Sequence, residues 1–233
     1  MIDAYIWTTG NGRKVVVACE EMGLAYRLHP VNIRRGDQFK PEFLRISPNN
    51  KIPAITDDDG PGGGSLAIFE SAAILMYLAE KSGRLLPAET AARYEVLQWL
   101  VFSVTALGPI IGQVHYFQGI AREGNEHALE RFRREIQRVF KVMEERLAES
   151  EWLGGDGYSI ADISTYCRAR GWKRLGIESA EVPHLRDWLA RIDERPAVRR
   201  ADGAIEEMRR ANETPMDEEA RRIMYGDRQL ARR

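Results

Sequence analysis

The stretch Asn50-Lys51-Ile52-Pro53-Ala54 places a proline directly ahead of a short apolar segment that has the composition of a strand. On both sides of it the chain alternates between the two-residue period of strands and the 3.6-residue period of helices. Strands are predicted at 2–7, 26–33, 54–56 and 66–69, and helices at 11–22 and 70–81. The first strand-helix-strand crossover makes its two strands parallel, and the glycine-rich tip at 60–64 fits a hairpin loop. The sequence therefore predicts one mixed sheet in the order βαβ-ββα with helices packed against it.

After Leu86-Pro87 the apolar residues recur at three- and four-residue spacing. Helices are predicted at 89–117, 125–150, 159–172, 182–194 and 197–211. The fold class is thus α/β followed by all-α. We expect a small α/β domain over residues 1–83, an all-helical domain over 89–211, and a charged C-terminal arm over 212–233 that covers the surface or is partly disordered.

The composition excludes several classes of function. The chain has 233 residues, is 44% hydrophobic and 30% charged, and carries a formal net charge of -1. That charge removes the general electrostatic argument for a nucleic-acid or membrane partner. The longest apolar run, 99–112, is short and contains Gly108-Pro109, and no signal peptide is recognisable, so a cytoplasmic location is expected. Cys19 and Cys167 lie far apart in the sequence, which indicates neither a disulfide framework nor a zinc site.

Three corners of the first domain carry polar side chains suited to binding. Thr9 and Asn11 stand where the first strand leads into a helix, whose free N–H groups could hold an anion or a thiolate, although on position alone a simple capping role is the more common explanation. A cis bond at Pro53 would expose the backbone of Ile52 to a peptide-like ligand, whereas a trans bond would start an edge strand. Glu70-Ser71 precedes a helix and suits an α-amino acid head group, or else is a plain cap.

Together these corners resemble the glutathione transferase superfamily, and the resemblance covers nearly the whole chain. It includes the Ile52-Pro53 turn, the Glu70-Ser71 pair and Ser159-Ile160-Ala161-Asp162 in the helical half. The run 36–55, together with Thr9-x-Asn11-Gly12 and Trp152-Leu153-Gly154-Gly155, is similar to the bacterial Nu class, which includes glutathione-dependent disulfide-bond reductases. The resemblance implies a thioredoxin-like N-terminal domain, an all-helical C-terminal domain and a homodimer.

The resemblance also implies roles for individual residues. Thr9 and Asn11 would neighbour the glutathione sulfur as the catalytic pair. The glutathione-binding residues would be Gln38 and Lys51 at the glycyl end, Ile52 at the cysteinyl backbone, Glu70 and Ser71 at the γ-glutamyl head, and Arg131 from the helical domain.

The function expected from this resemblance is thiol-disulfide exchange with glutathione as co-substrate and a small disulfide as acceptor. Hydrogen-bond donors and a helix N-terminus favour the thiolate, which attacks the disulfide, and a second glutathione releases the product. The alternatives are a transferase or peroxidase acting on electrophiles or hydroperoxides, and a non-catalytic glutathione-binding regulator. No metal is expected, because the four histidines lack ligand spacing.

Several other residues are interpreted as structural. Ser159 and Asp162 have capping-box spacing, the two cysteines fit small buried side chains, and Tyr5 alternates as a packing residue. The aromatic residues His115-Tyr116-Phe117 and Trp172 could line an acceptor pocket, but such residues belong to a helical core more often.

Overall fold

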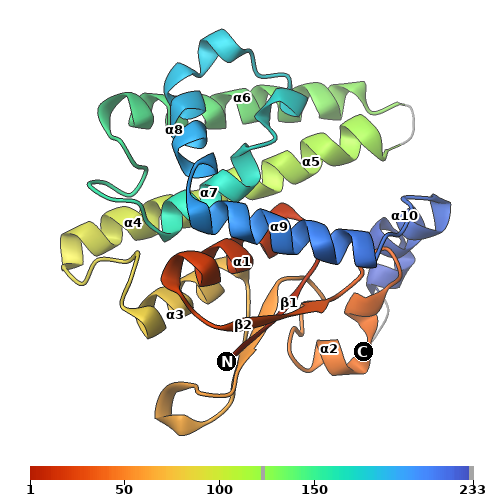
Figure 1. The fold of residues 1–233 in the computed structure, drawn as a ribbon. Coiled ribbons are helices and arrows are strands. Elements are labelled where there is room, and N and C mark those ends of the chain that lie inside the picture. The colour runs from red at the N-terminus through yellow and green to blue at the C-terminus, as the bar shows by residue number, and fades with distance from the viewer. Residues whose placement is uncertain (122–123, 231–233) are drawn as a thin grey trace. The chain divides into compact units, whose positions relative to one another are not determined.

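The computed structural model describes residues 1–121 and 124–230. They form two compact units, one made of Met1–Leu78 together with the chain from Arg199 onward, and the other made of Ala79–Val198 (Figure 1). Residues 199–211, expected in the helical domain, therefore group with the first unit. Ion pairs explain this placement, because Arg13 pairs with Asp202 and Arg200 contacts Glu20 at 2.6 Å.

The first unit contains the predicted sheet. Its strands are β1 (Ile2–Ile6), β2 (Tyr26–Pro30), β3 (Ala54–Asp57) and β4 (Leu66–Phe69). They lie in the order β2-β1-β3-β4, with β1 and β2 parallel and the other neighbours antiparallel. The expected βαβ-ββα order is confirmed, and the glycine-rich tip between β3 and β4 forms a hairpin loop with a short 3₁₀ turn at Pro61–Gly63.

Helices complete the first unit. They are α1 (Gly10–Met22), α2 (Pro41–Leu44), α3 (Ser71–Ser82, of which 71–78 belong here), α9 (Pro196–Ala211, of which 199–211 belong here) and α10 (Glu218–Tyr225), with 3₁₀ turns η1 (Asp37–Phe39) and η6 (Asp227–Leu230). Alternate residues of β1, which are Ile2, Ala4 and Ile6, are buried, as are Val15 and Val16 of α1. This alternation forms the core that holds the sheet in place.

The C-terminal arm contains a helix. Asp217 caps α10 by accepting a hydrogen bond from the Ala220 N–H (2.8 Å), and Ala220 and Ile223 bury the apolar side of the helix. A buried apolar face of this kind stabilises an otherwise charged helix. The arm is thus an ordered part of the first unit as far as residue 230.

The second unit is helical. Its elements are α4 (Thr90–Phe102), η3 (Ser103–Leu107), α5 (Gly108–Gly119), α6 (Glu126–Glu149), α7 (Ile160–Ala169), η4 (Trp172–Leu175), η5 (Ser179–Glu181) and α8 (Pro183–Asp193). The core of the unit includes Leu107, Phe140, Tyr166 and Trp188, all at most 1% exposed. Trp172, which the sequence analysis considered for either an acceptor pocket or the helical core, is also buried.

Gly108-Pro109 does not end the helix predicted over residues 89–117. Proline lacks an N–H and its ring would clash with a helical carbonyl four residues earlier. The chain accommodates it through a single π-helical turn, Ser103–Leu107, and continues as one helical run from Thr90 to Gly119. That run is long and apolar enough to cross a membrane by length and composition, a test that the core helix of a soluble protein also passes.

The Ser159–Asp162 pair has the structural role predicted for it. The Asp162 carboxylate accepts hydrogen bonds from the Ser159 N–H (3.0 Å) and hydroxyl (2.9 Å), the Leu153 N–H (2.9 Å) and the Trp188 indole (3.0 Å). Asp162 is fully buried, so these donors replace water around the carboxylate. The pair joins α7 to the loop before it and to α8.

Candidate functional site

The register of the sheet brings the three polar corners to one end of it. Tyr5 on β1 pairs with Ala54 on β3, and Ala54 pairs with Phe69 on β4. The chain therefore leaves β1, enters β3 and leaves β4 at the same end of the sheet. Thr9, Pro53 and Glu70 follow or precede these paired residues by only a few positions, so strand pairing alone places the corners together.

The first corner is the start of α1. Thr9 is the N-cap, and its Oγ1 accepts a hydrogen bond from the Gly12 N–H (3.2 Å), so the capping role is real. Because the hydroxyl oxygen accepts from the backbone, its proton stays available to a ligand. The Asn11 amide is partly exposed and has no hydrogen-bond partner among the residues the structure describes. No acidic residue occupies the first turn of α1, so the corner favours an anion.

The second corner is the turn before β3. The Ile52–Pro53 peptide bond is cis, which is the conformer suggested for a ligand-binding turn. Ser47, which precedes the turn, stabilises it by donating a hydrogen bond from its hydroxyl to the Lys51 carbonyl (2.8 Å). Pro53 is buried and Ile52 is partly exposed, and Ile52 packs against the cluster of Val31, Phe43 and Ala54.

The third corner joins β4 to α3. Glu70 has a φ of 70°, in the left-handed region that costs a non-glycine residue roughly 1–3 kcal/mol. Its exposed carboxylate accepts a hydrogen bond from the Asn49 amide (3.3 Å), which ties the third corner to the loop of the second. Ser71, the first residue of α3, is buried. Strain of this kind persists where the surroundings over-determine it, and it is typical of ligand sites.

The structure adds Lys14 to the site, a residue that the sequence analysis missed. Lys14 lies on α1, is 1% exposed, and donates a hydrogen bond from Nζ to the Ser71 Oγ (3.3 Å). With its oxygen engaged, the Ser71 hydroxyl can donate its own proton to a carboxylate. A buried lysine ammonium beside the start of α3 also adds positive potential there. Helix position gave no signal, because lysines in helices are usually exposed.

Gln38 and Lys51, predicted for the glycyl end, differ in their surroundings. Gln38 is buried, and its Nε2 donates to the Ile33 carbonyl (3.2 Å) while its Oε1 has no partner among the described residues. The Lys51 ammonium donates to the Gln229 Oε1 (2.8 Å). Partial burial of this amine lowers the pKa of Lys51. An exposed ammonium whose contact is a neutral amide has two further protons to donate to a carboxylate.

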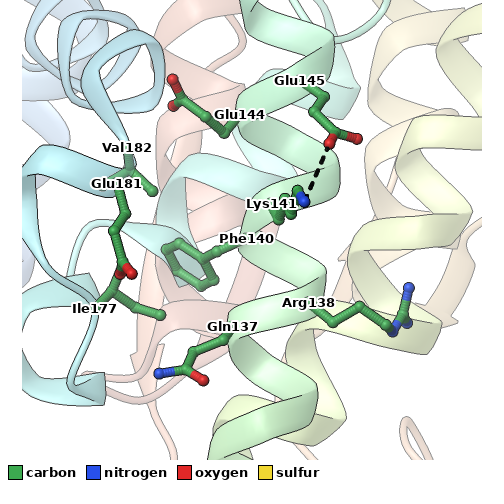
Figure 2. A pocket seen from close by; sticks show the side chains of 9 residues that line it. All are labelled: Gln137, Arg138, Phe140, Lys141, Glu144, Glu145, Ile177, Glu181 and Val182. Atoms are coloured by element: carbon green, nitrogen blue, oxygen red, sulfur yellow. Dashed lines mark ion pairs between the residues drawn. The ribbon is translucent and has the colours of Figure 1, made fainter.

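Arg131 is placed in the second unit. It lies on α6, is exposed, and has the Glu135 carboxylate 3.9 Å from its guanidinium. A cavity of about 570 Å³ is lined by another part of the same helix and by the loop around η5. Figure 2 shows Phe140, Ile177 and Val182 in its apolar wall and the Lys141–Glu145 ion pair beside them. None of the predicted site residues lines this cavity.

Neither cysteine has the surroundings of a nucleophile. Cys19 is fully buried, and burial, together with the charge of Glu20, raises the pKa of its thiol to about 12. Cys167 is 4% exposed. Since the thiolate is the reactive species, Cys19 is inert near neutral pH. Within residues 1–121 and 124–230, no group of three or more His, Cys, Asp or Glu side chains could hold a metal ion.

Comparison with known proteins identifies the family of this chain. Residues 11–81 match the glutathione S-transferase N-terminal domain, and residues 106–196 match the glutathione S-transferase C-terminal domain. The chain is 48% identical to the disulfide-bond oxidoreductase YfcG of Escherichia coli over 202 residues, which are 86% of this chain and 94% of that protein. The chain belongs to the glutathione S-transferase family.

Solved structures of this family agree. A glutathione transferase family member from Pseudomonas fluorescens, solved with two glutathione molecules bound, is 45% identical and superposes with a TM-score of 0.81, covering 86% of this chain and 91% of that one. A glutathione transferase from Pseudomonas putida, solved with one glutathione disulfide per subunit, is 41% identical with a TM-score of 0.80, covering 86% and 90%. The thioredoxin-like and helical halves predicted for this glutathione S-transferase are confirmed.

Proposed function

We propose that this protein is a glutathione-dependent disulfide-bond reductase of the Nu-class type. The observation that carries the proposal is the strand register that gathers the Thr9, Pro53 and Glu70 corners at one end of the sheet. A γ-glutamyl head group fits the Glu70–Ser71 corner, where Glu70 accepts from its ammonium and Ser71 donates to its carboxylate. Lys51 receives the glycyl carboxylate at the other end of the ligand.

The chemistry centres on the sulfur of the bound glutathione. The Thr9 hydroxyl and the Asn11 amide donate hydrogen bonds to the thiolate, and the positive end of α1 adds to their effect. These groups stabilise the thiolate and do not act as bases. The lower thiol pKa that results increases the fraction of glutathione present as nucleophile near neutral pH.

The reaction balances without a protein thiol. The thiolate of one glutathione attacks a disulfide, so that one S–S bond forms as another breaks and the first product leaves as a thiolate that takes up a proton. A second glutathione thiolate then attacks the mixed disulfide, releasing the second product thiol and glutathione disulfide. Two glutathiones are oxidised and one disulfide is reduced. The bound ligands of the two Pseudomonas structures support this sequence for relatives, and buried Cys19 agrees with it.

The proposal includes an oligomeric state and a cellular location. We infer a homodimer, in which the exposed apolar residues of α4, Tyr94 (66%) and Val101 (52%), pack against a second copy. We also infer a cytoplasmic location, where glutathione is mainly reduced and keeps both cysteines as thiols. Analytical ultracentrifugation tests the first inference, and fractionation tests the second.

A steady-state assay with purified protein and glutathione tests the function. It compares a small model disulfide with a chlorodinitrobenzene-type electrophile and with a hydroperoxide under the same conditions. Disulfide reduction far above the other two rates is expected. Dominant conjugation or peroxide reduction would replace the proposal with a transferase or peroxidase. Glutathione binding without turnover of any acceptor would replace it with a regulatory role.

A further inference from the structure

The C-terminal arm is fastened to the loop that carries Gln38. The Asn32 amide donates to the Thr214 hydroxyl (2.7 Å), and the Arg34 guanidinium donates to the Thr214 carbonyl. Asp217 and Glu219 of the arm line a groove of about 190 Å³ together with Arg34 and Arg35. The acidic residues at the start of α10 therefore face the arginines of this loop.

Past α10 the arm continues over the same loop to Lys51. The guanidinium of Arg228 lies over the Phe39 ring, with 5.4 Å between its Cζ and the ring centroid. It also lies 3.4 Å from the point where a Cβ atom on Gly36 would stand. Gly36 has a φ of 85°, a left-handed conformation that favours glycine, and the Arg228 side chain lies at ordinary contact distance above it. Next in sequence, Gln229 accepts from Lys51 and donates to the Ile223 carbonyl (3.0 Å).

Lys51 and Arg228 are held by neutral contacts. Neither Lys51 nor Arg228 has a carboxylate within ion-pair distance among the residues that the structure describes. Gln229 orients the Lys51 ammonium through one of its three protons and leaves the other two for a ligand. Arg228 and Gln229, the partner of Lys51, are consecutive residues, so the arm brings a cation held by neutral contacts next to the residue that contacts Lys51, an arrangement suited to an anion.

We propose that the C-terminal arm completes a carboxylate-binding subsite at the glycyl end of glutathione, with Gln229 positioning Lys51 and Arg228 supplying a second positive charge. The inference rests on the proposed function, since it takes Lys51 as the glycyl contact. The arm lies beyond residue 196, where the match to the glutathione S-transferase C-terminal domain ends. Arg228 and Gln229 thus contribute to ligand specificity from outside the matched domains. The subsite would select ligands that have a free terminal carboxylate.

Calorimetric titration of the full chain tests this subsite with two probes. The probes are glutathione and its monoethyl ester at the glycine carboxylate, which removes the charge and leaves the rest of the ligand unchanged. For the wild-type protein we expect the ester to bind about tenfold more weakly, a typical effect of losing a charged hydrogen bond. Arg228→Ala should reduce this ratio to about threefold or less, mainly by weakening the binding of glutathione. Arg221→Ala, which removes an exposed arginine from α10, is the matched control and should keep the wild-type ratio.

Two variants at Gln229 separate positioning from general packing. Gln229→Glu places a carboxylate on Lys51 that competes with the ligand, so it should weaken glutathione more than Gln229→Ala while barely affecting the ester. Equal loss for both probes, or no loss in either variant, would overturn the inference. Equal wild-type affinity for the two probes would overturn it as well and leave the proposed function standing. A wild-type protein that binds neither probe would overturn the proposed function too. Thermal melts confirm that every variant is folded.

Discussion

The Nζ of Lys14 and the Oγ of Ser71 form a buried hydrogen bond, 3.3 Å long, that connects α1 to the first residue of α3. These helices begin at two of the three corners of the candidate site. The contact therefore couples the corner proposed for the glutathione sulfur to the corner proposed for the γ-glutamyl head. A lysine with 1% exposure is buried at a cost unless its ammonium is hydrogen-bonded, and the contact with Ser71 supplies one such bond.

Removing this ammonium should weaken glutathione binding. Lys14→Met keeps the length of the side chain and removes its charge, and we expect a roughly tenfold higher Kd for glutathione, equivalent to about 1.4 kcal/mol. Ser71→Ala should produce a loss of similar size, and the double variant should lose less than the sum because the two residues act together. Calorimetric titration measures all three, and an unchanged Kd in Lys14→Met would remove Lys14 from the site.

Thr9 should affect both the stability of α1 and the acidity of the bound thiol. Thr9→Ala removes the cap on the Gly12 N–H and should cost about 1 kcal/mol of unfolding free energy. It also removes a donor to the thiolate, so the thiol pKa of bound glutathione should rise and the pH profile of kcat/KM should move to higher pH. Thr9→Ser retains the hydroxyl and should restore both properties. A Thr9→Ala profile identical to wild type would show that Thr9 only caps the helix.

The cysteines should be dispensable for turnover. The raised pKa of Cys19, about 12, keeps its thiol protonated throughout the range in which the enzyme is assayed. Replacing both Cys19 and Cys167 by serine should therefore leave disulfide reduction nearly intact, and alanine at both positions provides a variant without a buried hydroxyl. A loss of more than about 100-fold in kcat/KM in a folded variant would instead indicate a protein thiol in the reaction.

Asp162 should dominate the stability of the helical unit. Asp162→Ala leaves several buried donors unsatisfied and should lower the unfolding free energy by at least about 3 kcal/mol. Asp162→Asn keeps one acceptor oxygen and should lose less. Asp156→Ala, at an exposed position in the nearby loop, serves as the control and should change stability by less than about 0.5 kcal/mol. Chemical denaturation measures each variant, and equal stabilities for Asp162→Ala and the control would contradict this role.

Local sequence patterns predicted the sheet and most helices because each has a clear period. The Ile52–Pro53 bond is in the cis form considered for a ligand-binding turn, whereas the ligand-binding and catalytic roles assigned to the site residues all remain predictions. The second strand ends at Pro30, three residues earlier than expected, because Asn32 turns the chain through hydrogen bonds with Arg34 and Asp37. Such local turn contacts between side chain and backbone leave no periodic signal.

Long-range contacts explain what the sequence analysis missed. Lys14 resembles any surface lysine until its partner, 57 residues away, is known. The arm resembles a polar tail because its buried residues, Ala220 and Ile223, are few, and only the loop that they cover shows why it is ordered. The π-helical turn before Gly108 has a local cause instead. It accommodates the proline at position 109, and a pattern of apolar and polar residues does not distinguish a π-helical turn from an α-helical one.

The division of the chain into units has a consequence for how the protein is made. The first unit combines residues from both ends of the chain, and the entire second unit is synthesised between them. On the ribosome, strands β1–β4 emerge early, but the segment that covers Gly36 and contacts Lys51 emerges only after the whole second unit. Completion of the first unit must therefore wait until the second unit has been synthesised. A fragment that contains only the matched N-terminal domain would lack the segment from Arg199 onward, which belongs to the same unit.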